Sequence, residues 1–141
     1  MGGVVHSETR LCYIPFMQLE VCLAKIHRAT VTDADLDYMG SITIDGLLLD
    51  AAGLLPNQSV LVNSLANGVS WKTYIVRGEE GKGEIILNGP PAHHFKRGDM
   101  VIILSYVFVN EEEAKKMPHP TTVFVDEKNR MTEVKKGWRP S

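Results

Sequence analysis

The sequence predicts a mostly β fold, a small barrel with short helices. Apolar and polar residues alternate with a period of two in several short runs, which is typical of strands with one buried face; residues 41–45 are an example. Asn67-Gly68 lies between two such runs and is a strong hairpin signal. Helix-type signals frame only two brief segments. Many short strands at close spacing with two brief helices indicate a small barrel.

Each element is predicted from local patterns of this kind. The predicted strands are residues 21–31, 41–45, 59–65, 70–76, 83–88 and 99–109, with a final hairpin over 121–134. Thr32 is expected to cap a short turn over residues 33–38. Asp45 and Gly53 are expected to cap the start and the end of the first helix, because aspartate often caps helix N-termini and glycine commonly follows the last helical residue. Asn110 should cap the second helix, with Glu113 completing a capping box.

Composition indicates an ordinary globular chain without a nucleic-acid or membrane partner. The 141 residues are 44% hydrophobic and 23% charged, with a net charge of -2 that offers no attraction to anionic polymers or lipids. No apolar run reaches the length of a membrane span. Two cysteines are too few for a disulfide framework or a zinc site, and His93 and His94 are adjacent, a spacing that disfavours shared metal ligation on a strand. A reducing cytoplasm and no metal are therefore expected.

The chain is predicted to hold one domain with two short extensions. Residues 1–16 match neither the strand-rich pattern of residues 17–134 nor that of a secretory signal, so they are an extra N-terminal arm or a start-site artefact, with Met17 as a natural internal start. Residues 17–134 carry the barrel domain, and residues 135–141 are expected to form a flexible C-terminal tail.

A Gly-Ser pair at positions 40 and 41 directly precedes a predicted strand. Such a pair is usually only a turn, and Tyr74, Lys25 or Asn88-Gly89 alone would usually be structural. Together, however, the segments KIHRATVTDADLDYMGSITID, NGVSWKTYIV, ILNGPPAH and GDMVIILSY resemble the pyruvoyl-dependent bacterial aspartate decarboxylases, from Met17 to about Val134. This resemblance implies a double-psi β-barrel that forms a homotetramer with active sites between subunits. It also implies conversion of L-aspartate to β-alanine and CO2 for pantothenate biosynthesis.

In the family that the chain resembles, the bond between the residues matching Gly40 and Ser41 breaks without a protease. A serine hydroxyl needs positioning or activation before it attacks, and a donor must hold the developing oxyanion. Glycine at position 40 is expected to supply backbone angles that a Cβ would forbid. The ester formed by Ser41 then eliminates to dehydroalanine, which hydrolyses to a pyruvoyl group. No PLP is expected, because this ketone is itself the electron sink that forms a Schiff base with the substrate.

The resemblance also implies roles for the surrounding residues. Tyr74 corresponds to the proton donor and Thr73 to the residue that polarises the Gly40 carbonyl during cleavage. Lys25 would hold a substrate carboxylate. The remaining expected contacts of the substrate or the pyruvoyl group are Asn88, Gly89, Tyr38 and His27.

Two departures from the family pattern concern substrate recognition. The family usually has an arginine four residues before the catalytic tyrosine, and this chain has Ser70 there; Lys72, on the same strand face, is expected to supply the charge. Pro90 and Pro91 replace small residues of a pocket segment and remove two backbone N–H donors. Two alternatives therefore stay open: decarboxylation of another small amino acid, or a non-catalytic homologue serving as a binding or assembly module.

Overall fold

A computed structural model describes residues 17–37 and 39–136. The residues predicted as an N-terminal arm, Tyr38 and most of the predicted C-terminal tail lie outside these ranges. The chain divides into two compact units, one of Cys22–Tyr106 with Pro118–Ser141 and one of Met1–Val21 with Val107–Met117. The residues proposed for chemistry that the structure describes all belong to the first unit, and its fold is the one that positions the candidate site.

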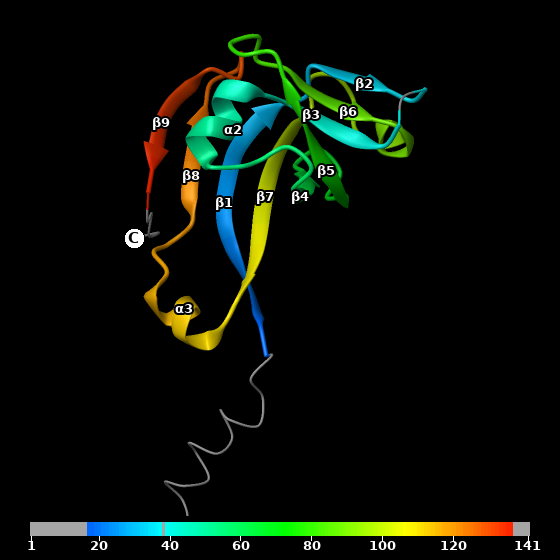
Figure 1. The fold of residues 1–141 in the computed structure, drawn as a ribbon. Coiled ribbons are helices and arrows are strands. Elements are labelled where there is room, and N and C mark those ends of the chain that lie inside the picture. Colours follow the sequence, from blue (N-terminus) through cyan, green and yellow to red (C-terminus); the bar gives the residue numbers. More distant parts are fainter. Residues whose placement is uncertain (1–16, 38, 137–141) are drawn as a thin grey trace, which may run out of the picture. The chain divides into compact units, whose positions relative to one another are not determined.

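The described chain is mostly β, with its strands in one sheet, as predicted (Figure 1). The strands have the order β2-β6-β3-β5-β4-β7-β1-β8-β9 across the sheet. Their bounds are β1 Leu19–Thr30, β2 Asp33–Asp35, β3 Ser41–Asp45, β4 Ser59–Ser64, β5 Ser70–Gly78, β6 Ile85–Asn88, β7 Met100–Val109, β8 Thr121–Val125 and β9 Met131–Lys135. The predicted small barrel with short helices is confirmed at this level: a single, mostly strand-built sheet with only brief helical segments in the described residues.

Three strand pairs are parallel and join segments that are distant in sequence: β1 with β8, β2 with β6, and β3 with β5. The predicted hairpins are antiparallel, β4 with β5 and β8 with β9. Strand β3 lies between β5 and β6, so both of its edges are hydrogen-bonded. A central strand of this kind has little freedom to move, and it begins at Ser41.

Alternation on β3 fixes which way its side chains point. Ile42 and Ile44 are fully buried in the hydrophobic core. Successive side chains of a strand face opposite sides of the sheet, so Ser41 and Thr43 lie on the face away from these isoleucines. The core includes residues from most strands: Ala24, Ile26, Ile42, Ile44, Val60, Val62, Ile75, Ile85, Leu87, Val101, Ile103 and Val123.

The two predicted α-helices form with the predicted caps. Helix α2, Gly46–Ala52, has Asp45 as its N-cap and Gly53, in the left-handed conformation, as its C-cap. It packs against β8 and β9 (Figure 1). Helix α3, Glu111–Lys116, starts at Asn110 with a complete capping box to Glu113. In both cases the side chain that satisfies the first free N–H groups was recognisable from the sequence.

One turn prediction is wrong in part. Residues 33–38 were expected to form a turn capped by Thr32, but Asp33–Asp35 is a short strand, β2, paired with β6. The Thr32 hydroxyl donates to the Ile85 carbonyl at 3.1 Å and accepts from the Ile85 N–H at 2.9 Å. Thr32 thus ties β2 to a neighbouring strand, a long-range contact that a local pattern does not reveal.

Candidate active site

Ser41 is the first residue of β3, and its side chain is fully buried. Its hydroxyl donates to the Met39 carbonyl at 3.3 Å and accepts from the Asn88 amide nitrogen at 3.0 Å. No ionisable side chain among the described residues is hydrogen-bonded to it. The hydroxyl is therefore positioned by neutral groups, inside the protein, directly beside the Gly40–Ser41 peptide.

Asn88 reaches Ser41 because the two residues are cross-strand partners. Strands β3 and β6 run antiparallel with Ser41 opposite Asn88, and Asn88 is only 4% exposed. The same amide nitrogen also donates to the Thr43 hydroxyl at 3.2 Å. Gly89 comes next with a positive φ of 83° and donates its N–H to the Asp35 carbonyl at 2.7 Å, which turns the chain sharply after β6. The structure thus brings the predicted Asn88 and Ser41 together.

Tyr74 and Thr73 lie on β5, the parallel neighbour of β3. The register pairs Ile42 with Ile75, so Tyr74 and Ser41 each lie one residue before a paired position. By strand alternation, Tyr74 shares the sheet face of Ser41, and Thr73 faces the opposite side. Tyr74 is 38% exposed, whereas Ser41 is buried. The site is thus buried at its serine and open to solvent along β5.

Lys72 and Ser70 continue the face of Tyr74 along β5, and both are exposed. Ser70 lies opposite Asn63 of β4, and its hydroxyl donates a short hydrogen bond to the Asn63 side-chain Oδ1. In the family that the chain resembles, this position carries an arginine. Here it carries a neutral serine that is hydrogen-bonded across the strands to Asn63. Lys72 is the cation that this face of β5 offers.

In the resting structure, Gly40 does not adopt the left-handed backbone that glycine permits. Its φ lies outside the left-handed region, and a Cβ added there would meet its nearest atoms at 3.9–4.0 Å, an ordinary contact distance. Those atoms belong to the Asn88 carbonyl, the Pro90 ring and the Trp71 ring. Sequence reasoning did not single out Trp71, because an aromatic residue on an alternating strand carries no signal beyond packing.

Pro90 and Pro91 open a 3-10 helix, η1, over Pro90–His93. Proline is tolerated at such a start because its missing N–H would have no intrahelical partner. Ala92 donates its N–H to the Gly89 carbonyl at 3.0 Å, which closes the turn. The two prolines therefore stiffen the segment beside Gly40 without leaving a helical hydrogen bond unmade.

Lys25 and His27 lie on β1, away from Ser41 in the sheet order. Strands β5, β4 and β7 separate β3 from β1. Both side chains alternate with the buried Ala24 and Ile26, so they point away from the core.

The His27 ring packs edge-on against Phe124. Burial lowers the pKa of His27 below its usual value, and the Arg28 and Lys25 charges lower it further. Within one chain, no hydrogen bond or ion pair of the described residues connects either side chain to Ser41.

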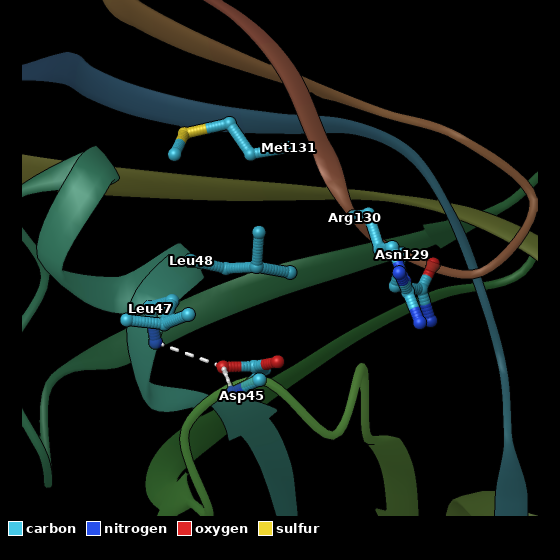
Figure 2. A pocket seen from close by; sticks show the side chains of 7 residues that line it. Asp45, Leu47, Leu48, Asn129, Arg130 and Met131 are labelled. Carbon is cyan, nitrogen blue, oxygen red and sulfur yellow. Dashed lines mark hydrogen bonds between the residues drawn. The ribbon is translucent and has the colours of Figure 1, made fainter.

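A pocket of about 400 Å³ lies at the other end of β3, lined by Asp45, Leu47, Leu48, Gly81, Asn129, Arg130 and Met131 (Figure 2). None of the predicted site residues lines it.

Asp45 in this pocket is only 3% exposed, and its carboxylate accepts hydrogen bonds from three backbone N–H groups. They belong to Leu47 at 2.8 Å, Gly81 at 3.0 Å and Gly83 at 2.7 Å. A carboxylate saturated in this way is a structural anchor. Ser41 and its neighbours therefore remain the candidate site.

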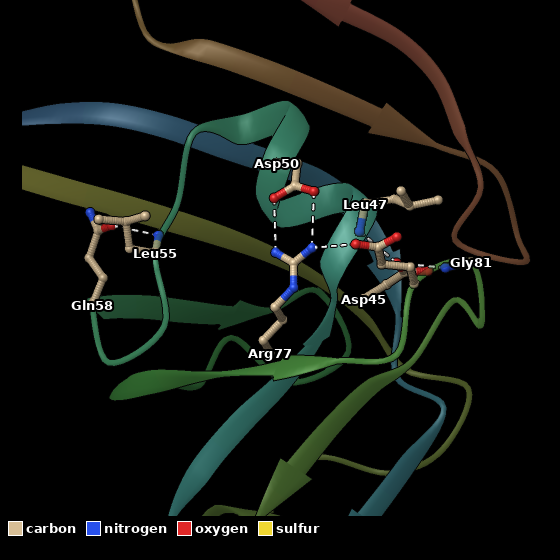
Figure 3. A network of polar contacts seen from close by, with 8 residues as sticks. Asp45, Leu47, Asp50, Leu55, Gln58, Arg77 and Gly81 are labelled. Carbon is tan, nitrogen blue, oxygen red and sulfur yellow. Dashed lines mark hydrogen bonds and ion pairs between the residues drawn. The ribbon is translucent and has the colours of Figure 1, made fainter.

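The surroundings of Asp45 are a polar network at the surface (Figure 3). Arg77 of β5 makes a bidentate pair with Asp50 of α2 at 2.8 and 3.0 Å, and it also pairs with Glu80 at 2.7 Å. Gly46 leaves room for this guanidinium, since a Cβ there would lie 2.8 Å from it. The network fixes α2 to β5 and leaves no unpaired acidic group within it to act on a substrate.

Two features are absent from the described residues. Residues 17–37 and 39–136 contain no group of three or more His, Cys, Asp or Glu side chains that could hold a metal ion. No helix in this part of the chain is long and apolar enough to cross a membrane.

Comparison with known proteins places this geometry in a family context. Residues 17–132 match the aspartate decarboxylase family. The chain is 50% identical over 119 residues to the aspartate 1-decarboxylase of Carboxydothermus hydrogenoformans, covering 84% of this chain and 93% of the relative. It is 51% identical to the enzyme of the same name from Syntrophus aciditrophicus, covering 82% and 98%, and 52% identical to that of Chloroherpeton thalassium, covering 81% and 83%.

Proposed function

This chain belongs to the aspartate decarboxylase family, and we propose that it is a pyruvoyl-dependent aspartate 1-decarboxylase that matures by breaking its own Gly40–Ser41 bond. It then converts L-aspartate to β-alanine and CO2, the step that supplies pantothenate biosynthesis. One observation carries the proposal: the fully buried Ser41 hydroxyl comes directly after glycine and is held by the Asn88 amide and the Met39 carbonyl.

Self-cleavage begins when the Ser41 oxygen adds to the Gly40 carbonyl carbon. The hydroxyl first leaves the Met39 carbonyl, to which it donates at 3.3 Å. The Gly40–Ser41 C–N bond breaks, the amine takes up a proton, and an ester joins Gly40 to the serine oxygen. Loss of the Ser41 α-proton then expels the Gly40 carboxylate and leaves dehydroalanine. Addition of water with release of ammonia yields the pyruvoyl group, so no oxidant or reductant is needed.

The residues around Ser41 suit this sequence of steps. Thr73, at the position of β5 that continues the register toward Gly40, is the group assigned to polarise the Gly40 carbonyl. Burial of Ser41 keeps bulk water from the ester before elimination. Asn88 keeps an N–H donor beside position 41 both before and after cleavage.

The pyruvoyl ketone supplies an electron sink for loss of the substrate carboxylate. Tyr74 of β5 shares the sheet face of Ser41 of β3, and its hydroxyl is assigned the return of a proton to the substrate Cα. Asn88 and Gly89 form the end of β6 and the turn after it, and they are assigned to contact the substrate or the pyruvoyl group. Tyr38 is assigned to the pocket wall from the sequence alone.

Recognition of the substrate carboxylate is assigned to lysines. Lys72 is an exposed cation on the face of Tyr74, and Ser70 is committed to Asn63. Lys25 and His27, three intervening strands away, are assigned to a site completed by a second copy of the chain. This arrangement is the reason to propose a homotetramer with active sites between subunits. The same proposal takes residues 17–134 as the functional domain.

Intact mass and a substrate panel test the proposed function. Purified protein should separate into a fragment ending at Gly40 and a larger fragment with a ketone terminus, and it should release CO2 from L-aspartate. A single uncleaved chain without decarboxylation would favour a non-catalytic homologue. Because Ser70 replaces an arginine, the panel should include glutamate and small neutral amino acids; turnover of one of these in place of aspartate would assign the alternative substrate.

A further inference from the structure

Thr43 contacts the reactive region, although the proposed mechanism gives it no role. It lies two residues after Ser41 on β3, so both hydroxyls emerge on the same face of the sheet. The Asn88 amide nitrogen donates to both, at 3.0 Å to Ser41 and at 3.2 Å to Thr43. One buried amide is thus shared between a reacting hydroxyl and a hydroxyl that stays unchanged.

We propose that Thr43 is a positioning residue for self-cleavage and for decarboxylation, because its hydroxyl holds the Asn88 amide against position 41. The inference rests on the proposed function and deepens it. The terminal torsion of asparagine is broad and roughly two-fold, so a single contact defines the amide plane poorly. A second hydroxyl, at a fixed place, selects the orientation in which the nitrogen faces Ser41.

The position of Thr43 is itself well defined. It pairs with Val76 of β5 on one side and with Ile86 of β6 on the other, so its backbone is held at both strand edges. Threonine is β-branched and has few χ1 rotamers, which keeps the hydroxyl in place at low entropic cost. Asn88, the last residue of β6, is likewise paired with Asp35 of β2 and Ser41 of β3, so the Thr43 hydroxyl fixes the orientation of its side-chain amide and not its backbone.

The contact outlasts the maturation step. Cleavage before residue 41 leaves Thr43 on the same fragment as the new terminal group, two residues away. Asn88 can therefore stay anchored after the Ser41 hydroxyl has been lost. A role of this kind predicts an effect on both reactions, whereas a role in attack alone would affect only maturation.

The test compares Thr43→Val, which keeps the branched shape and removes the hydroxyl, with Thr43→Ser, which keeps the hydroxyl. Thr43→Val should slow fragment formation about two- to tenfold, the range expected for one neutral hydrogen bond. It should lower kcat for decarboxylation by a similar factor and leave KM unchanged. Thr43→Ser should stay near the parent in both. Thr132→Val, on the edge strand β9, is the matched control and should change neither rate.

The outcomes separate this inference from the proposed function. A cleaving parent with an equally fast Thr43→Val variant overturns the role of Thr43 alone, as does a Thr43→Ser variant as slow as Thr43→Val. A parent that neither cleaves nor decarboxylates overturns the proposed function and this role with it. If Thr43→Val fails to fold, Thr43→Ala is measured in its place. In a Ser41→Ala background, removing the Thr43 hydroxyl should also speed hydrogen exchange of the Asn88 side-chain amide, measured by NMR.

Discussion

The two ends of strand β3 are both buried, and they are built in opposite ways. At its start, Ser41 has two neutral hydrogen-bond partners, at 3.0 and 3.3 Å, and one of them is a side-chain amide. At its end, Asp45 accepts three backbone N–H groups at 2.7–3.0 Å. Hydrogen bonds to an ionised group are shorter and roughly twice as strong as neutral ones. The Asp45 carboxylate is therefore held more firmly than the Ser41 hydroxyl, which can exchange its partners while the strand stays in place.

Under the proposed function, this difference places a stabilising contact and the reacting hydroxyl at opposite ends of the five-residue strand β3. A group that must change partners during a reaction is best held by weak contacts, since strong ones would have to be broken in the transition state. A group that fixes a helix start and a loop is best held by strong ones. Asn129 adds further hydrogen bonds near Asp45. Its side-chain oxygen accepts from the Thr30 N–H, and its amide nitrogen donates to the Thr30 and Gly83 carbonyls, all at 2.7–2.8 Å. Substitutions at the two ends should thus change different measurements.

The largest effect is expected from Ser41→Ala. Without the hydroxyl there is no nucleophile, so the protein should stay a single chain and show no decarboxylation. Stability should change little, because the Asn88 amide keeps its bond to Thr43. Intact mass and thermal unfolding measure the two properties. Cleavage of this variant would show that the assigned nucleophile is wrong.

Asp45→Ala should have the opposite effect to Ser41→Ala: it should lower stability and leave cleavage intact. It leaves three backbone N–H groups without an acceptor and removes the cap of α2, so the free energy of unfolding should fall by about 3 kcal/mol. Folded protein should still cleave at its normal position. Urea unfolding gives the first quantity and intact mass the second.

Asp45→Asn is the matched variant, since it keeps one acceptor oxygen and should lose less stability than the alanine. An alanine variant as stable as the parent would contradict the role of Asp45 as an anchor.

Lys72→Ala tests the role proposed for the solvent-exposed face of β5 beside Ser41. Removing the cation from the face of Tyr74 should lower kcat/KM for aspartate about ten- to a hundredfold, the cost of one hydrogen bond to a charged group, and leave self-cleavage intact. Ser70→Arg should raise kcat/KM, because a bidentate pair with a carboxylate is stronger than a point-charge contact. Steady-state kinetics with aspartate measure both.

Ser70→Arg leaves the Asn63 side-chain oxygen opposite the new guanidinium, where it competes with the substrate carboxylate, so the variant should also be measured with Asn63→Ala. Should Lys72→Ala match the parent, carboxylate recognition rests on Lys25 or on other groups.

Local signals predicted much of this fold, and long-range ones were missed. Asp45, Gly53 and Asn110 marked the helix ends correctly because capping is a contact between near neighbours in sequence. The parallel pairing of β3 with β5 left no local trace, since the strands meet only in the folded sheet. Strand β2 was missed for the same reason, because it is only three residues long and exists through its pairing with β6.

The candidate site shows the same division. Ser41 and Asn88 were predicted from a resemblance, and their contact agrees with the register of β3 and β6. Thr43 was not singled out, because a threonine on a strand is ordinary in sequence and its significance lies in one hydrogen bond to a residue 45 positions away. Lys25 is separated from Ser41 by three strands of the sheet, so the role proposed for it rests on the proposed second copy of the chain.

The smallest effect is expected from Gly40→Ala, next to the bond that is proposed to break. A Cβ at Gly40 would contact the Asn88 carbonyl, Pro90 and Trp71 at 3.9–4.0 Å without a clash, and the backbone there is not left-handed. Stability should therefore change by less than about 1 kcal/mol, and cleavage should persist.

Gly83→Ala is the matched contrast, near Asp45 at the other end of β3, because its φ is +68° and a Cβ would lie against the Lys128 carbonyl oxygen. That variant should be strongly destabilised. Thermal unfolding ranks the two, and intact mass monitors cleavage. If Gly40→Ala folds like the parent but stays a single chain, the attack of Ser41 needs a backbone arrangement at position 40 different from the resting one, and the glycine serves the reaction rather than the fold.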